Sequence, residues 1–109
     1  MNRYGGKVAI ALGCFAGAVA ACSRPVPRSH TVTIQNFAFV PAELTVAAGD
    51  TVVWSNKDIV PHSATARDAA WDSKPIDANA AWRGVAPARG RHDYYCVLHP
   101  NMKATLVVR

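Results

Sequence analysis

The chain has 109 residues, of which half are hydrophobic, and a formal net charge of +5. This length supports one small domain with a single core. The mild excess of positive charge favours an acidic docking partner or an anionic membrane surface. No run of basic residues with interleaved aromatics is present, which excludes a nucleic-acid-binding protein.

The N-terminal segment, residues 1–22, has the features of an export signal. Arg3 and Lys7 precede an apolar run from Val8 to Ala21, and small residues lead to Cys22. A membrane-spanning helix needs about 20 apolar residues, which is more than this run contains. We therefore expect a cleaved signal peptide rather than a retained membrane anchor.

Two cleavage sites compete in this segment. Val19-Ala20-Ala21-Cys22 resembles the lipobox of bacterial lipoproteins, whereas Ala18-Val19-Ala20 suits an ordinary signal peptidase. We favour the lipobox, which places a lipid on Cys22. Either site predicts a periplasmic or otherwise exported protein, and the lipobox adds an anchor to a bacterial membrane.

Residues 23–29 are polar, contain two prolines and show no periodicity, which predicts a short stiff tether before a domain at 30–109. Cys14 is lost with the signal peptide. If Cys22 carries lipid, Cys96 is the only free thiol of an exported protein. A free thiol in an oxidising compartment requires an explanation, and metal ligation provides one.

The domain shows the alternation of apolar and polar residues that is typical of half-buried strands. The positions that mark these strands are, in chain order, Val32 and Ile34; Leu44 and Val46; Val52 and Trp54; Trp82 and Val85; His92, Tyr94 and Cys96, which share one face; and Ala104, Leu106 and Val108. Turns are predicted at 48–50 and 87–90. For residues 66–81 a short helical turn and an edge strand both stay open, while Pro75 argues against a long helix. The predicted fold class is all-β, a sandwich or barrel of two packed sheets.

The most informative segment contains Cys96, His99 and Met102 at three-residue spacing. A thiolate, an imidazole and a thioether suit copper better than zinc, because zinc sites use Cys, His and carboxylate ligands. A Cys and two His with a weak axial Met form the ligand set of blue-copper centres. His62, which follows Pro61, is the best candidate for the second His, since loops at one end of a sandwich can bring it beside the Cys96 segment.

Other assignments of these residues carry less weight. His30, beside the tether, is expected to be solvated, and His92 is expected to pack beneath the site rather than bind metal. Met102 could fill the core, and Cys96 could pair with a His as a nucleophile and base. An enzyme of that kind also needs an oxyanion stabiliser and an orienting third group, and nothing around Cys96 indicates either.

From about Val32 to Arg109 the chain resembles the cupredoxins, the small type 1 blue copper proteins, and in particular their amicyanin-like, plastocyanin-like members. The matching segments are Pro41-Ala42-Glu43-Leu44, Gly49-Asp50-Thr51-Val52, Trp54-Ser55-Asn56, Pro61-His62, Gly90, Asp93-Tyr94-Tyr95-Cys96, His99-Pro100, Met102 and Val107-Val108. The short Cys-x-x-His-x-x-Met loop with Pro after its His is the specific amicyanin-like feature.

The resemblance implies a cupredoxin-like Greek-key β-sandwich with one type 1 copper ion per chain. Its equatorial ligands would be His62, Cys96 and His99, and its axial ligand Met102. It also implies a monomeric electron carrier and no enzyme. Single electrons would pass to redox partner proteins through the exposed edge of His99. An apolar patch that includes Leu98 and Pro100 would surround this edge. The alternative is a protein that carries or buffers copper for delivery, without electron transfer.

Three positions depart from the family pattern. Relatives commonly have Asn after the first His ligand and Ser or Thr after the Cys, and these side chains tie the two ligand loops together. This chain has Ser63 and Val97 there, so the usual tie cannot form. The backbone N–H of Ser63 could still bond the sulfur of Cys96. His92 replaces an aromatic residue that is usual in the strand before the Cys.

Overall fold

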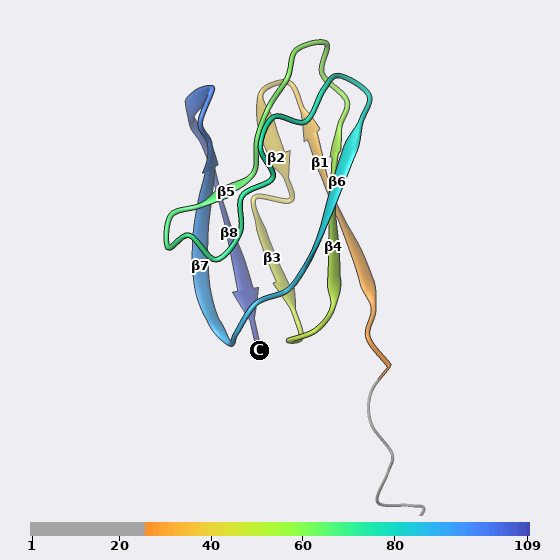
Figure 1. Cartoon of the computed structure of the whole chain (residues 1–109), viewed down its shortest axis with the longest axis vertical. Helices are drawn as coiled ribbons and strands as arrows, with labels where there is room; N and C mark the ends of the chain where they lie inside the picture. Colours follow the sequence, from red (N-terminus) through yellow and green to blue (C-terminus); the bar gives the residue numbers. More distant parts are fainter. Residues whose placement is uncertain (1–25) are drawn as a thin grey trace, which may run out of the picture.

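The computed structural model describes residues 26–109 and shows a sandwich of two four-stranded sheets (Figure 1). The predicted signal peptide, the lipobox and residues 23–25 of the tether lie outside the described residues. The strands are β1 (Ser29–Gln35), β2 (Ala38–Val40), β3 (Glu43–Val46), β4 (Thr51–Asn56), β5 (Thr65–Ala66), β6 (Ala81–Val85), β7 (Gly90–Cys96) and β8 (His99–Val108). Within residues 26–109 no helix has the length and apolar character needed to cross a membrane.

Each sheet combines one parallel pair with antiparallel pairs. One sheet has the strand order β2-β1-β4-β6 and the other β3-β8-β7-β5. The parallel pairs are β1 with β4 and β3 with β8. The all-β, two-sheet prediction is therefore confirmed.

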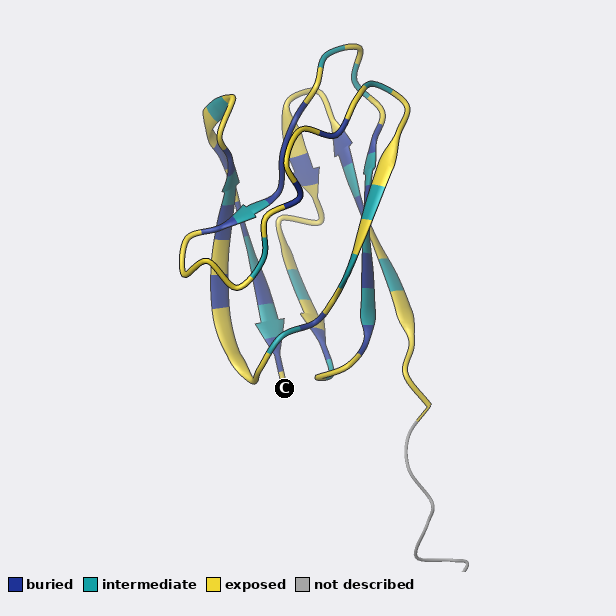
Figure 2. Cartoon of the chain, viewed as in Figure 1, coloured by how far each residue is buried: buried dark blue, intermediate teal, exposed yellow. Residues whose placement is uncertain are grey.

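The core lies between the sheets, where alternate residues of β1, β4, β7 and β8 are buried (Figure 2). Val32 and Ile34 of β1, Trp54 of β4 and Leu106 of β8 are at most 2% exposed. Side chains of a strand point alternately to its two faces, so this alternation directs one face of each sheet inward. All strands and all buried core residues of the described chain lie within 29–108, so this segment has a complete core of its own.

The predicted strands are present, but three details differ from expectation. Strand β1 begins at Ser29, one residue inside the predicted tether. The last strand starts at His99, so the end of the predicted metal segment is itself part of β8. β2 and β5 are short and were not predicted, because three and two residues show no clear alternation.

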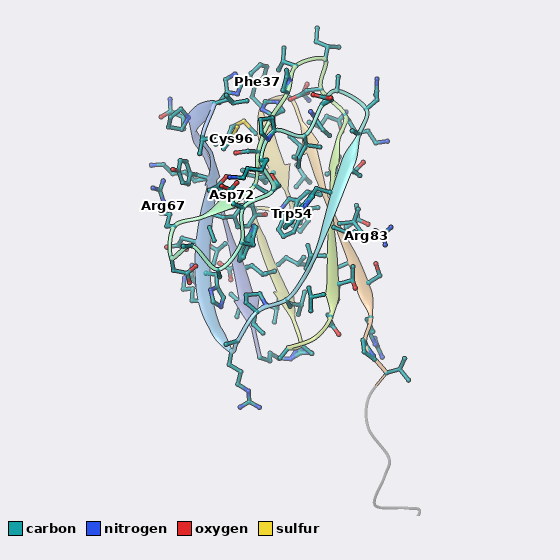
Figure 3. All side chains as sticks on the ribbon, viewed as in Figure 1. Phe37, Trp54, Arg67, Asp72, Arg83 and Cys96 are labelled. Atoms are coloured by element: carbon teal, nitrogen blue, oxygen red, sulfur yellow. The ribbon has the colours of Figure 1, made fainter. Side chains whose placement is uncertain are left out.

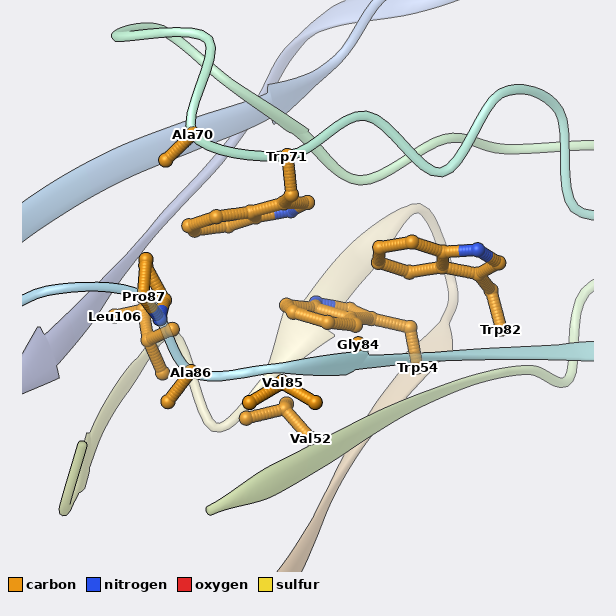
Figure 4. Close-up of a pocket in the computed structure, with 10 residues that line it drawn as sticks. All are labelled: Val52, Trp54, Ala70, Trp71, Trp82, Gly84, Val85, Ala86, Pro87 and Leu106. Carbon is orange, nitrogen blue, oxygen red and sulfur yellow. The ribbon is translucent and has the colours of Figure 1, made fainter. Parts of the chain in front are cut away.

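Residues 66–81 form no helix and contribute the end of β5, the first residue of β6 and two isolated bridges, at Asp72 and Ile76. Their main contribution to packing is Trp71, whose ring stacks on Trp54 at a centroid distance of 5.6 Å (Figure 4). Trp82 packs against Trp54 at 5.5 Å and lies over Gly84, where a Cβ atom would approach its ring to 2.9 Å. Together the three indoles line a cavity of about 220 Å³ between β4, β6 and this stretch.

The connections gather at two ends of the sandwich. At the upper pole, at the top of Figure 1, lie the turn at 36–37, the loop 57–64 and the β7–β8 hairpin turn at 97–98. At the opposite end, which we call the basal pole, lie residues 26–28, 47–50, 86–91 and 109.

Candidate metal centre

Three of the four predicted ligands meet at the upper pole. His62, Cys96 and His99 each offer one donor atom, and these atoms all lie within 4.8 Å of one another. The Sγ atom of Cys96 is 3.7 Å from Nδ1 of His62 and 3.7 Å from Nδ1 of His99. His62 and Cys96 are fully buried, while His99 is partly exposed.

Strand ends hold these side chains in place. Cys96 ends β7, His99 begins β8, and a register shift at Tyr95 and Cys96 makes them direct partners across the hairpin. His62 is fixed by an isolated bridge to Ile76, in which the backbone N–H of each donates to the carbonyl of the other, at 3.1 and 2.6 Å. Sites held by a scaffold keep their geometry whether or not metal is bound.

Met102 follows His99 by three residues on β8 and is 4% exposed. It belongs to the same hydrophobic cluster as Cys96. It also lines, with Phe37, Leu98, His99, Pro100 and Asn101, a groove of about 430 Å³ at the upper pole. The fold therefore brings all four predicted ligands to one end of the sandwich.

The spacing of the donors fits a shared metal ion. A thiolate and an imidazole nitrogen bound to one first-row metal at about 2.3 and about 2.0 Å lie about 3.7 Å apart when the angle between them is about 120°. Both pairs have this separation. Two imidazole nitrogens that face one buried sulfur at this separation are the arrangement expected when all three atoms share a metal ion.

Asp58 orients His62 from behind. Its Oδ2 atom is 2.8 Å from Nε2 of His62 and also accepts the backbone N–H of Phe37 at 2.9 Å, while Oδ1 accepts that of Asn36 at 2.7 Å. Burial opposes its ionisation, yet the N–H of Phe37 and the His62 ring together hold the pKa of Asp58 below its usual value. An ionised Asp58 makes Nε2 the protonated nitrogen, which leaves the Nδ1 lone pair of His62 free to face Cys96.

Ser63 joins the two ligand-bearing loops. Its backbone N–H points to the sulfur of Cys96 at 3.2 Å, as expected from the sequence. Its hydroxyl oxygen accepts the backbone N–H of Val97 at 3.0 Å and lies 2.9 Å from Oγ1 of Thr65. The usual tie between two side chains is absent, as expected, but the hydroxyl of Ser63 joins the two loops by bonding the backbone of Val97 instead.

The sequence did not single out Phe37, which covers both imidazoles. Its ring meets those of His62 and His99 edge-on, with centroids 5.1 and 4.9 Å away, and it is 51% exposed. Phe37 and Asn36 adopt left-handed backbone angles in the β1–β2 turn. The only sequence signal was Asn before an aromatic residue between two apolar stretches, which marks a turn but not its neighbours.

The other two His residues lie outside the donor cluster. His92 presents Nδ1 to Oδ2 of Asp68 at 2.7 Å and Nε2 to the carbonyl of Ala88 at 2.8 Å. Both partners are acceptors, so the imidazolium form of His92 can donate to both of them. The bonds to Ala88 and Asp68 raise the pKa of His92, against the effect of burial. The ring of His92 packs against Trp71 and bonds Ala88 at the basal pole, so these contacts direct it toward that pole and not against a predicted ligand.

His30 was expected to be solvated, and this prediction was only partly right. Its Nε2 atom lies 2.9 Å from Oδ2 of Asp50 at the basal pole, and its side chain is 24% exposed. The residue helps to fix the start of β1 rather than to bind metal.

Known proteins share this combination. The family model described as a cupredoxin-like domain matches residues 7–108. Amicyanin-alpha of Methylorubrum extorquens is 30% identical over 98 residues, which cover 85% of this chain and 82% of the relative. A solved oxidized mutant of amicyanin has a TM-score of 0.69 at 29% identity, covering 74% of this chain and 82% of that one. A copper-containing nitrite reductase of Thermus scotoductus, at 24% identity and a TM-score of 0.68, covers 80% of this chain and 23% of its own and shares the fold alone.

The two-sheet sandwich and the Cys-His-His donor set define the class of small blue copper electron-transfer proteins. The chain belongs to the cupredoxin-like family, and the relatives it matches are amicyanins.

Proposed function

We propose that this chain is a type 1 copper protein that carries single electrons between redox partners by cycling one ion between Cu(I) and Cu(II). His62, Cys96 and His99 would hold the ion, and Met102 would be a fourth, weaker ligand. The observation that carries the proposal is the placement of two imidazole Nδ1 atoms at 3.7 Å from one buried sulfur.

Copper supplies a one-electron couple that a mixed thiolate, imidazole and thioether set serves in both oxidation states. The protein's part is to hold the donors still. Asp58 fixes the His62 ring, and Ser63 fixes the sulfur of Cys96 and the start of the hairpin turn. Little rearrangement between oxidation states favours rapid electron exchange.

Electrons enter and leave through the edge of His99. This residue is partly exposed, while His62 and Cys96 have no exposed surface. Phe37 and Leu98, which are 51% and 48% exposed, flank it together with Pro100. We call Phe37, Leu98 and Pro100 the port patch, and propose that redox partner proteins dock on it. Figure 3 shows Phe37 and Cys96 at the upper pole.

The remaining assignments rest on the sequence. We propose an exported, periplasmic and monomeric carrier with no enzymatic step of its own. The lipobox at residues 19–22 supports a lipid on Cys22 and attachment to a bacterial membrane.

Delivery of copper to another protein, the second candidate, could use the same ligands. Full burial of His62 and Cys96 favours retention of the metal over release. The two functions differ in what is transferred, which is an electron in one case and the ion in the other.

Nuclear magnetic resonance line broadening in mixtures of reduced and oxidised protein tests this choice. We expect rapid electron self-exchange, together with slow loss of copper to a Cu(I) chelator. Slow self-exchange with rapid copper transfer to the chelator would assign the chain to delivery instead.

A further inference from the structure

Exposed positive charge gathers at the basal pole, opposite the metal centre. Four arginines lie there and all are exposed: Arg28, Arg89, Arg91 and Arg109. The pairings Ser29 with Thr51 and Gly90 with Val108 place the strand ends that carry them at one level (Figure 1). Arg28 and Arg109 also line one groove of about 480 Å³.

The only acidic residue of the basal pole is Asp50, and its charge is directed inward. Asp50 is 5% exposed and accepts the backbone N–H groups of Arg28 and Ala47, each at 3.0 Å. Its Oδ2 atom also lies 2.9 Å from Nε2 of His30. These bonds, of which the one from Arg28 has the largest effect, lower the pKa of Asp50 to about 2. The carboxylate is therefore charged, but its hydrogen bonds are made within the protein and not to solvent.

Outside the basal pole the balance of charge reverses. The other described residues carry five basic side chains and six acidic ones. Two of these acids reach toward the pole, since Glu43 and Asp93 lie 3.4 and 3.9 Å from Arg91. Among residues 26–109, no acidic side chain lies within ion-pair distance of Arg28, Arg89 or Arg109, and all three arginines are exposed.

The described chain also begins at this pole. Val26, which is 80% exposed, precedes Arg28. Val85 at the end of β6 is 69% exposed and pairs with Thr51, which in turn pairs with Ser29. Apolar side chains among arginines are typical of surfaces that lie on membranes. From Cys22, our proposed lipid site, to Ser29 the tether spans at most about 25 Å, so a lipid there would hold the arginines near the bilayer.

We propose that the basal pole is a membrane-facing surface that rests on the phosphate groups of anionic phospholipids. Guanidinium groups bind phosphate oxygens in pairs, and each arginine near an anionic surface strengthens binding about fivefold. This orientation turns the port patch away from the bilayer, toward partners in the surrounding compartment. The proposed membrane surface includes no copper ligand, so it can be tested independently of electron transfer.

Vesicle flotation with a chain of residues 23–109, which retains the complete core, tests the proposal. Vesicles of phosphatidylglycerol and phosphatidylcholine are compared with vesicles of phosphatidylcholine alone. We expect binding only to the anionic vesicles, with and without copper, and weaker binding at high salt.

A triple variant, Arg28→Gln, Arg89→Gln and Arg109→Gln, should weaken binding by about a hundredfold at low salt. Lys57→Gln, Lys74→Gln and Arg83→Gln remove the same net charge elsewhere and should change binding several-fold at most. Equal losses in both triples would mean that net charge acts without a defined surface. Absence of binding to anionic vesicles would overturn the proposal, and an acidic protein would then be the partner to test for these arginines.

Discussion

The hydroxyl oxygen of Ser63 lies 3.0 Å from the backbone nitrogen of Val97 and accepts its hydrogen bond, although 34 positions separate the two residues. The backbone N–H of Ser63 meanwhile points to the sulfur of Cys96. One fully buried serine thus connects the His62 loop to the hairpin that carries the other ligands.

Ser63→Ala should lower the free energy of unfolding of the copper-free protein by about 0.5–1.5 kcal/mol, because the N–H of Val97 loses its hydrogen-bond partner in the protein. Urea denaturation measures the change. Ser55→Ala on β4, a half-buried serine without a side-chain bond in the structure, is the matched control and should cost less. Equal stability of Ser63→Ala and the parent protein would show that the tie contributes nothing.

Asp58→Ala should raise the reduction potential of the copper protein. The anionic partner increases the basicity of His62 and so favours Cu(II), and removal of such partners weakens metal binding by about 10–100-fold. A tenfold loss that affects Cu(II) alone corresponds to about 59 mV for a one-electron couple. Asp77→Ala is the control for a lost negative charge. If both variants shift the potential equally, contact with His62 is not the cause.

Phe37→Lys should slow electron self-exchange by about tenfold or more, since two like charges would meet when two port patches approach. The visible spectrum should not change, because Phe37 touches the ligand rings without binding metal. Phe37→Leu keeps the apolar surface and should exchange nearly normally. Val85→Lys, at an exposed apolar site near the other pole, should have little effect. An unchanged rate of electron self-exchange in Phe37→Lys would mean that electrons enter and leave at another part of the surface.

His92 should make stability depend on pH. Its pKa is raised in the folded protein by the carbonyl of Ala88 and by Asp68. Its contribution is therefore complete below about pH 6.5, the ordinary value, and is lost as the pH rises through the folded-state pKa. We expect this decline in the unfolding free energy of the copper-free protein, and its reduction in His92→Gln and Asp68→Asn. Parallel profiles for the parent and both variants would contradict the imidazolium.

The strands and the ligands could be predicted because each has a local signal. Alternation marks Val32 and Ile34 as inward-facing, and the spacing of Cys96, His99 and Met102 indicates copper. His62 could be added because its donor type completes the set.

The groups that support the ligands could not be predicted, because they act across the loops. Asp58 meets Phe37 over 21 positions, and Ser63 meets Val97 over 34. Such contacts depend on how the loops approach one another in space, including the turn at Asn36 and Phe37 with its left-handed backbone angles. The periodicity of the sequence carries no information about this approach. The conformation of residues 66–81 stayed open for a similar reason. Single bridges and the packing of Trp71 hold this stretch, and neither has a local sequence pattern.

The visible absorption spectrum of the protein loaded with Cu(II) tests the central claim most directly. Binding of one copper ion by Cys96, His62 and His99 predicts an intense blue colour from thiolate-to-copper charge transfer, its bleaching on reduction, and its loss in Cys96→Ala. A colourless protein with one bound Cu(II), or a colour that survives Cys96→Ala, would contradict the account.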